Sequence, residues 1–234
     1  MAGFRRQDQA LVWNLGHQTV RIEPWGSDSL RVRASENAEI LDDLPQALLP
    51  PRSTTVNIKT DAERGLIHNG AIAAEVMLDK NTIRFFNPSN GFEYLAEDTR
   101  HHWPPARNFR HAGGDHFEVE VRFKAYEDER IYGLGHHQHG YLDQKGCVID
   151  LVQFNTETSV PFLLSNRGYG FLWNNPAVGR VELGKNATRW IALATFQVDY
   201  WITAGATPAE ILEHYANATG HPPMMPDWAM GFWQ

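Results

Sequence analysis

Apolar and polar residues alternate with a period of two along much of this chain. The clearest run is Phe117 to Phe123, in which Phe and Val occupy every second position between Glu and Arg. This period is typical of a β-strand with one buried face and one wet face. The pattern also pairs 19–25 with 29–34, and 71–78 with 82–86, across short turns. Many short strands separated by turn residues favour an antiparallel β-sandwich over β-α-β units.

The last third of the chain adds strands and one helix. Residues 168–173, 190–195 and 198–203 are apolar runs of strand length. A helix is predicted over residues 208–219, because its start and end signals are both present. These signals are Thr207 at the N-cap, Pro208 at the first helical position, Glu210 in a capping box, and Gly220 after the end. The face expected to be buried carries Ile211, Leu212 and Tyr215.

Prolines separate this helix from an apolar C-terminal segment. Pro222, Pro223 and Pro226 predict a stiff, extended linker. The final run, residues 227–234, is typical of a strand buried on both faces, as in a parallel sheet. We therefore expect a β-sandwich domain over residues 1–220, and a linker with the first strand of another domain over 221–234. A parallel strand needs a partner reached by a crossover, so a longer protein is expected.

Composition excludes several classes of protein. The formal net charge of −7 and the lack of basic runs argue against a nucleic-acid-binding surface. Cys147 is the single cysteine, so no internal disulfide is possible, and it is expected to be a buried small apolar residue. The sequence contains no stretch of 18 apolar residues, so it predicts no membrane span, and no apolar leader is visible near the start. These features favour a cytoplasmic location.

Several segments in order resemble the amino-terminal region of glycoside hydrolase family 31. Residues 131–135 (IYGLG) are similar to a "(F/Y)-Y-G-(L/F)-G" motif of that family, and 165–175 (SNRGYGFLWNN) to its "GYG" hairpin. Residues 155–162 resemble its "Asn-x-acid … Pro-Phe" loop and strand. Residues 199–231 match its "DY … G-x-TP … Y … TG-x-P … P-x-WA-x-G" join almost throughout. The run 135–141 (GHHQHGY), with Lys145-Gly146, looks closest to the α-xylosidase-type branch.

The resemblance implies a galactose-mutarotase-like β-sandwich with one C-terminal helix, followed by the first strand of a missing (β/α)8 barrel. It also implies a retaining α-glycosidase that acts on α-xylosides or α-glucosides. Retention needs two carboxylates about 5–5.5 Å apart, and in the family these are Asp residues on barrel segments beyond the Trp228-Ala229-x-Gly231 match. The sequence holds no candidate for either role, so we expect the chain to be inactive without the barrel.

In relatives, a sandwich loop reaches over the barrel mouth, and an acidic residue on it binds sugar hydroxyls. Glu157 matches that position, although the family usually has Asp there, and its carboxylate can accept paired hydrogen bonds from hydroxyls. The candidate substrate-binding residues are Glu157, Asn155, Thr156, His137 and Tyr141. The competing interpretation is an ordinary surface loop. The expected partners are an α-linked oligosaccharide or glycoside and the catalytic barrel. The sequence does not decide whether the chain also forms a homo-oligomer.

Two alternatives remain at the level of the sequence. His136, His137 and His139 could suggest a metal site, but no Cys or carboxylate keeps a ligand spacing with them. We therefore expect neither a metal nor a cofactor. The chain could also be a free-standing carbohydrate-binding or aldose-mutarotase-like module. A mutarotase would need a His acid and a Glu base in one groove, and no spacing selects such a pair.

Overall fold

The computed structural model describes residues 3–37, 39–44, 47–51, 54–98 and 105–231, and they form a mainly β structure. Its strands are β1 (Gly3–Gln7), β2 (Ala10–Leu15), β3 (Gln18–Pro24), β4 (Ser29–Ser35), β5 (Asn57–Thr60), β6 (Arg64–Asn69), β7 (Ile72–Met77), β8 (Thr82–Phe86), β9 (Glu93–Ala96), β10 (Arg107–Gly113), β11 (His116–Lys124), β12 (Ile131–His136), β13 (Val148–Leu151), β14 (Thr158–Ser165), β15 (Tyr169–Trp173), β16 (Gly179–Leu183), β17 (Ala187–Thr195) and β18 (Val198–Ala204). The helix α1 spans Pro208–Thr219, and a 3-10 helix, η1, spans Asp227–Met230.

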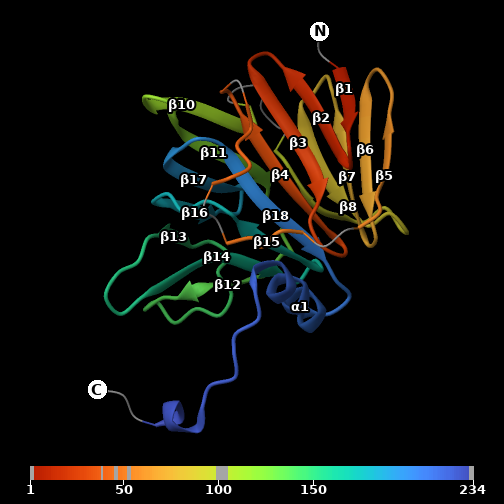
Figure 1. Cartoon of the computed structure of the whole chain (residues 1–234). Coiled ribbons are helices and arrows are strands. Elements are labelled where there is room, and N and C mark those ends of the chain that lie inside the picture. The colour runs from red at the N-terminus through yellow and green to blue at the C-terminus, as the bar shows by residue number, and fades with distance from the viewer. Residues whose placement is uncertain (1–2, 38, 45–46, 52–53, 99–104, 232–234) are drawn as a thin grey trace.

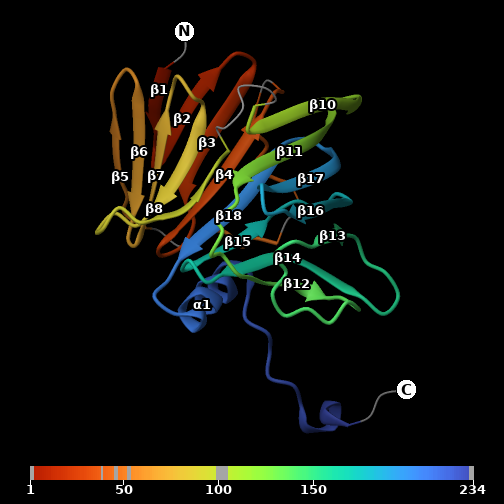
Figure 2. The ribbon, with the colours of Figure 1, turned by 180° about the vertical axis from the view of Figure 1, so that it is seen from behind.

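The strands form three antiparallel sheets in two layers (Figures 1 and 2). One layer is an eight-stranded sheet with the order β1-β2-β3-β4-β18-β15-β14-β12. The other layer consists of two five-stranded sheets, β10-β11-β17-β16-β13 and β5-β6-β7-β8-β9. The predicted β-sandwich is therefore confirmed.

Tyr200 on β18 shows how the two layers share one core. Its ring packs against Phe85 of β8, with centroids 6.2 Å apart, and against Phe123 of β11, at 5.7 Å. Each of these rings comes from a different five-stranded sheet, so Tyr200 contacts both from the eight-stranded sheet. All three residues are fully buried. Edge-to-face aromatic pairs at such distances add to the hydrophobic stabilisation of a core.

The predicted hairpins form as expected. Strands β3 and β4 pair around residues 25–28, and β7 pairs with β8 around residues 78–81. Along β11 the buried residues alternate strictly with partly exposed ones, as the sequence pattern predicts. Cys147 packs against the edge of the core, as expected of a small apolar residue, but it is only partly buried rather than buried.

One buried ion pair lies within the eight-stranded sheet, and another connects residue 97, just after β9, to β10 in the other five-stranded sheet. Arg31 on β4 donates from Nε and Nη2 to the two carboxylate oxygens of Asp199 on β18, at 3.0 and 2.5 Å. Glu97 contacts Arg107 in the interior and also accepts the backbone N–H of Ile83 at 2.8 Å. Burial raises the pKa of the Asp199 and Glu97 carboxyl groups, and the neighbouring arginines oppose that shift.

The connection between β4 and β5 crosses the outer face of the eight-stranded sheet (Figure 1). Side chains of the sheet bind its backbone: the Leu41 N–H donates to Gln197 Oε1 at 2.9 Å, and the Ala47 N–H donates to Asn174 Oδ1 at 3.2 Å. Farther along, the Leu49 N–H donates to the carbonyl oxygen of Ala218 on α1 at 2.8 Å. The connection therefore ties the helix to the sheet.

Helix α1 begins and ends where the sequence predicts. Thr207 accepts the Glu210 N–H through its side chain, and Gly220 follows the last turn with φ of 110°. Ile211 is buried and Tyr215 is partly buried, with its ring 4.1 Å from that of Phe162. The prediction for Leu212 was wrong, because half of this side chain is exposed and Ala218 is buried instead. The helix contacts the sheet along a narrower stripe than its apolar residues suggest.

The strand predicted at the C-terminal end is not found over the described part of that segment. Residues 221–226 extend away from the sheets, and residues 227–230 form the 3-10 helix η1 (Figure 1). The last three residues of the predicted strand, 232–234, lie outside the described part of the chain. A central strand requires partners for its backbone N–H and C=O groups on both edges. None of the described strands pairs with residues 227–231, so the local i→i+3 pattern forms instead.

Candidate functional site

The site expected from the sequence begins at an irregular point in β12. Gly133, Leu134 and Gly135 all have positive φ, at 99°, 69° and 98°, and the pairing of β12 with β14 shifts register there. A Cβ atom on Gly135 would overlap the Thr158 carbonyl oxygen, so glycine is required by both conformation and space. The bulge buries Leu134 completely and redirects the chain that follows it.

His137 is held at the end of this bulge. One ring nitrogen, Nε2, lies 2.8 Å from the carbonyl oxygen of Leu134. A carbonyl oxygen can only accept, so Nε2 carries the proton of this hydrogen bond. The His137 side chain is 7% exposed. Its orientation is therefore set by the bulge and by packing.

The second part of the site is the loop between β13 and β14, residues 152–157. Gln153 closes its base, since its side chain donates to the Ser159 carbonyl at 2.8 Å and accepts the Ser159 N–H at 3.1 Å. Thr156 has φ of 73°, which is unusual for a β-branched residue and often marks functional loops. The Gln138 amide reaches across and donates to the Thr156 hydroxyl at 2.5 Å.

Glu157 joins the two parts. Its Oε2 lies 3.6 Å from Nδ1 of His137, while 30% of its side chain stays exposed. The carboxylate therefore lies beside the imidazole and is partly exposed to solvent.

Three rings form a column beside this contact. The His137 and His139 rings stack with centroids 5.7 Å apart, and His139 stacks on Tyr141 at 5.3 Å. The Tyr141 N–H also donates to Nδ1 of His139 at 3.1 Å. Tyr141 is 65% exposed, so the column runs from a buried imidazole to a solvent-facing phenol. Both histidines of the stack lie beyond the end of β12.

The structure places four of the five predicted substrate-binding residues around this junction: His137, Tyr141, Thr156 and Glu157. The fifth, Asn155, is exposed on the same loop, and no described residue forms a hydrogen bond with its side chain. Sequence reasoning missed Gln138 and His139 as connecting residues. Their position in the GHHQHGY run, between the predicted residues His137 and Tyr141, could have identified them.

The described residues contain no group of three His, Cys, Asp or Glu side chains that could hold a metal ion. Within the part of the chain that the structure describes, no helix is long and apolar enough to cross a bilayer.

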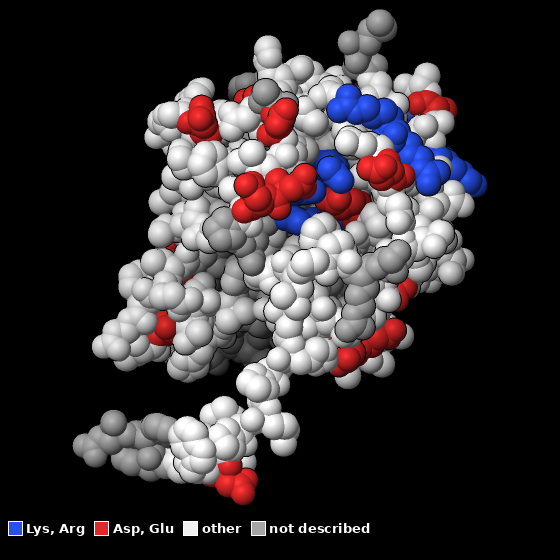
Figure 3. Space-filling view, in the orientation of Figure 1, with Lys and Arg blue, Asp and Glu red and all other residues white. Residues whose placement is uncertain are grey.

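The surface near α1 and residues 221–231 differs in charge from the upper part of the molecule. Figure 3 shows Lys and Arg gathered on the upper part of this face, intermixed with Asp and Glu. On the lower part some Asp and Glu are visible, but no Lys or Arg. Exposed apolar side chains occur along the lower segment, namely Leu212, Met224, Met225, Trp228 and Met230. Such a concentration is typical of a surface that another domain or protein covers.

Comparisons with known proteins agree with this architecture. The family model described as the glycosyl hydrolase 31 N-terminal galactose mutarotase-like domain matches residues 19–182. The structure is similar to that of a GH31 α-xylosidase from a soil metagenome complexed with xylose, with a TM-score of 0.91 and 42% identity over 98% of this chain and 36% of that one. The chain belongs to glycosyl hydrolase family 31 and corresponds to its N-terminal region.

Two curated relatives are similar in sequence. An uncharacterized family 31 glucosidase, ORF2 of Pseudescherichia vulneris, is 39% identical over 96% of this chain and 46% of its own length. α-Xylosidase A of Aspergillus niger is 42% identical over 52% of this chain and 17% of its own length. The chain thus spans less than half the length of these relatives.

Proposed function

We propose that this chain is the carbohydrate-contacting, pocket-closing module of a retaining α-glycosidase that acts on α-xylosides or α-glucosides. In this proposal residues 1–220 form the sandwich, and residues 221–234 lead into a catalytic barrel that binds against it. The Asp nucleophile and the Asp acid/base belong to that barrel. The 234 residues alone are then catalytically inactive.

The observation that carries this proposal is the contact between His137 and Glu157. It brings together two loops that the family resemblance marks separately, and the carboxylate at this contact is partly exposed. A carboxylate of this kind accepts hydrogen bonds from two sugar hydroxyls. Tyr141, exposed at the end of the ring column, offers an aromatic face to the apolar side of a sugar. Asn155 and Thr156 would add polar contacts from the same loop.

The mutarotase alternative is less well supported. A mutarotase needs its His acid and Glu base on opposite sides of a sugar ring. His137 and Glu157 contact one another at 3.6 Å, which leaves no room for a sugar between them. The two side chains could therefore contact a sugar only from the same side.

The test joins residues 1–231 of this chain to the barrel of the similar Aspergillus niger α-xylosidase A and assays aryl α-xyloside and aryl α-glucoside. We expect Glu157→Gln to lower kcat/KM by about 10- to 100-fold, because a charge-assisted hydrogen bond contributes about 1.5–3 kcal/mol. Glu127→Gln, at an exposed position outside the site, is the matched control. Equal activity of the two variants would exclude Glu157 from the site.

The proposed inactivity of the isolated chain has its own test. Turnover of either substrate by the purified 234-residue chain, free of contaminating glycosidase, would refute it.

A further inference from the structure

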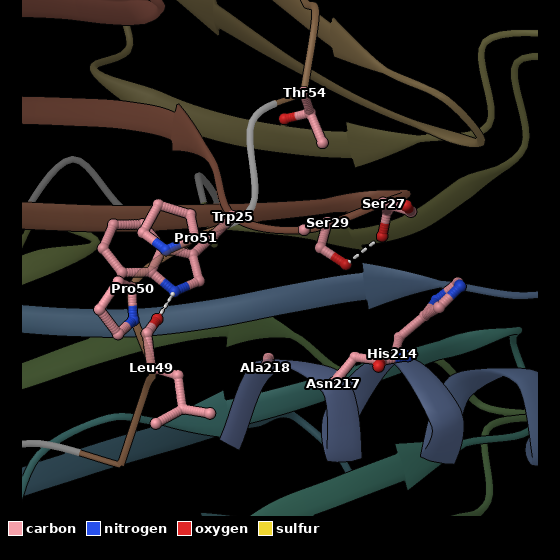
Figure 4. A pocket seen from close by; sticks show the side chains of 11 residues that line it. Trp25, Ser27, Ser29, Leu49, Pro50, Pro51, Thr54, His214, Asn217 and Ala218 are labelled. Atoms are coloured by element: carbon pink, nitrogen blue, oxygen red, sulfur yellow. Dashed lines mark hydrogen bonds between the residues drawn. The ribbon is translucent and has the colours of Figure 1, made fainter. Parts of the chain in front are cut away.

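A pocket of about 340 Å³ lies between helix α1 and the turn that follows β3 (Figure 4). Three parts of the chain that are distant in the sequence form it: the turn at residues 25–29, residues 49–51 with Thr54 from the connection between β4 and β5, and the last turns of α1. It shares no residue with the junction of His137 and Glu157. Pockets for small ligands in proteins begin at about 300 Å³, so this one has room for a compact molecule.

Trp25 forms a rigid wall of this pocket. Its indole Nε1 donates to the Leu49 carbonyl at 3.0 Å, and its own carbonyl accepts Nε1 of Trp201 at 2.9 Å. The Arg31 guanidinium lies 4.3 Å from the centre of the indole. Arg31 is itself held by Asp199, so the ring is fixed before any ligand arrives. A preorganised aromatic wall lowers the entropic cost of binding.

Polar groups face the same space from the helix and the turn (Figure 4). His214 is oriented by a hydrogen bond of 2.9 Å between its Nδ1 and the Thr203 hydroxyl. Its Nε2 lies beside the Asp28 carboxylate, 3.8 Å from Oδ2, and has no hydrogen-bond partner among the described residues. The Asn217 amide lies one turn away and is exposed, with Glu213 and His221 as replaceable partners. Ser27 and Thr54 add hydroxyl groups to the lining.

The described lining residues include no Lys, Arg, Asp or Glu, although the Asp28 carboxylate lies at the edge of the pocket beside His214. Their chemistry is an indole, an imidazole, an amide and hydroxyls beside the small apolar surfaces of Leu49 and Ala218. This combination suits an uncharged ligand that has both hydroxyl groups and an apolar face. We propose that the Trp25–His214 pocket binds a saccharide unit, at a site separate from the one that contains Glu157. The choice of a sugar as the uncharged ligand rests on the proposed function, whereas the pocket and its polarity do not.

The test is a titration of the isotope-labelled 234-residue chain, followed by NMR. The probes are D-xylose, D-glucose, maltose and maltotriose. We expect saturable shifts, with a dissociation constant in the millimolar range, at the Trp25 indole N–H and at the amides of Leu49 and Ala218. Shifts with the monosaccharides indicate a site for a free sugar, and shifts with maltotriose alone indicate a site for the distal unit of a longer chain. Both results support a saccharide pocket.

His214→Ala and Asn217→Ala should each raise this dissociation constant by about tenfold, which corresponds to one lost hydrogen bond. His17→Ala, at an exposed position at the other end of β3, is the matched control and should leave it unchanged. Glu157→Gln should also leave it unchanged, which separates this pocket from the proposed substrate site. Absence of saturable shifts at Trp25 would overturn the proposal. So would shifts of equal size in wild type and in both pocket variants, or shifts confined to residues 152–157.

Discussion

The imidazole of His137 places its Nδ1 3.6 Å from Oε2 of Glu157, and its Nε2 2.8 Å from the carbonyl oxygen of Leu134. The ring thus links a strained backbone bulge to the loop that carries the carboxylate. We propose that His137, which is mostly buried, acts as a positioning residue for Glu157.

Replacing His137 should loosen the loop at residues 152–157. We expect His137→Ala to increase amide hydrogen exchange in that loop several-fold, because Glu157 loses its contact and the ring column loses its base. The fold should remain, since the loop lies outside the core. His17→Ala is the control for loss of an exposed imidazole. Unchanged exchange in residues 152–157 would show that the imidazole does not position the loop.

Gly135 should tolerate no side chain. We expect Gly135→Ala to lower the free energy of unfolding by about 3 kcal/mol or more, because a Cβ atom would overlap the Thr158 carbonyl in a positive-φ conformation. Gly140→Ala is the matched control. Gly140 also has positive φ, at 73°, but no atom lies within 4 Å of its added Cβ, so a loss of about 1 kcal/mol is expected. Urea unfolding measures both, and similar losses would contradict a steric requirement at Gly135.

Glu93 should make stability depend on pH in the acid range. Burial alone would raise its pKa, but hydrogen bonds from Lys124, Tyr126 and Arg84 outweigh this effect and lower the pKa below its usual value. A lowered pKa means that the carboxylate contributes stability above the unfolded-state pKa, near 4.5, and that this contribution disappears as pH falls through the folded-state pKa.

We therefore expect Glu93→Gln to cost about 1–2 kcal/mol at pH 7, after allowance for solvent screening. The difference from wild type should shrink as the pH falls below 4.5. Urea denaturation at several pH values measures it, with the exposed Glu127→Gln as a control that changes little. A difference that stays constant from pH 7 to the acid range would contradict the assignment.

The apolar segment around η1 should promote association of the isolated chain. Trp228 is 74% exposed and Met230 is 77% exposed. Trp228→Ser should lower the fraction of associated protein in sedimentation experiments without changing the unfolding midpoint, because Trp228 lies outside the sandwich. Val178→Ser, at a position 53% exposed on the sandwich, should have a smaller effect. Equal association of wild type and Trp228→Ser would show that another surface is responsible.

Local patterns predicted most of the secondary structure. The alternation in residues 117–123 and the capping signals at Thr207 and Gly220 are decided by neighbouring residues, so they can be interpreted without a fold. Leu212 was misassigned because a helix can carry more apolar residues than its partner sheet covers. The strand expected over residues 227–234 was wrong for 227–230, since a strand depends on partners that a local pattern does not supply.

The sequence by itself determined the β-sandwich, the helix over residues 208–219, the family, and the two loops of the candidate site. Only the tertiary structure decided that these loops meet. His137 and Glu157 come together because β12 pairs with β14 and the bulge at residues 133–135 turns the chain towards the following loop. The pocket at Trp25 depends on tertiary contacts in the same way, because its walls come from three segments far apart in the chain. Side-chain periodicity reports which face of an element is buried, whereas the meeting of distant loops depends on strand order and register.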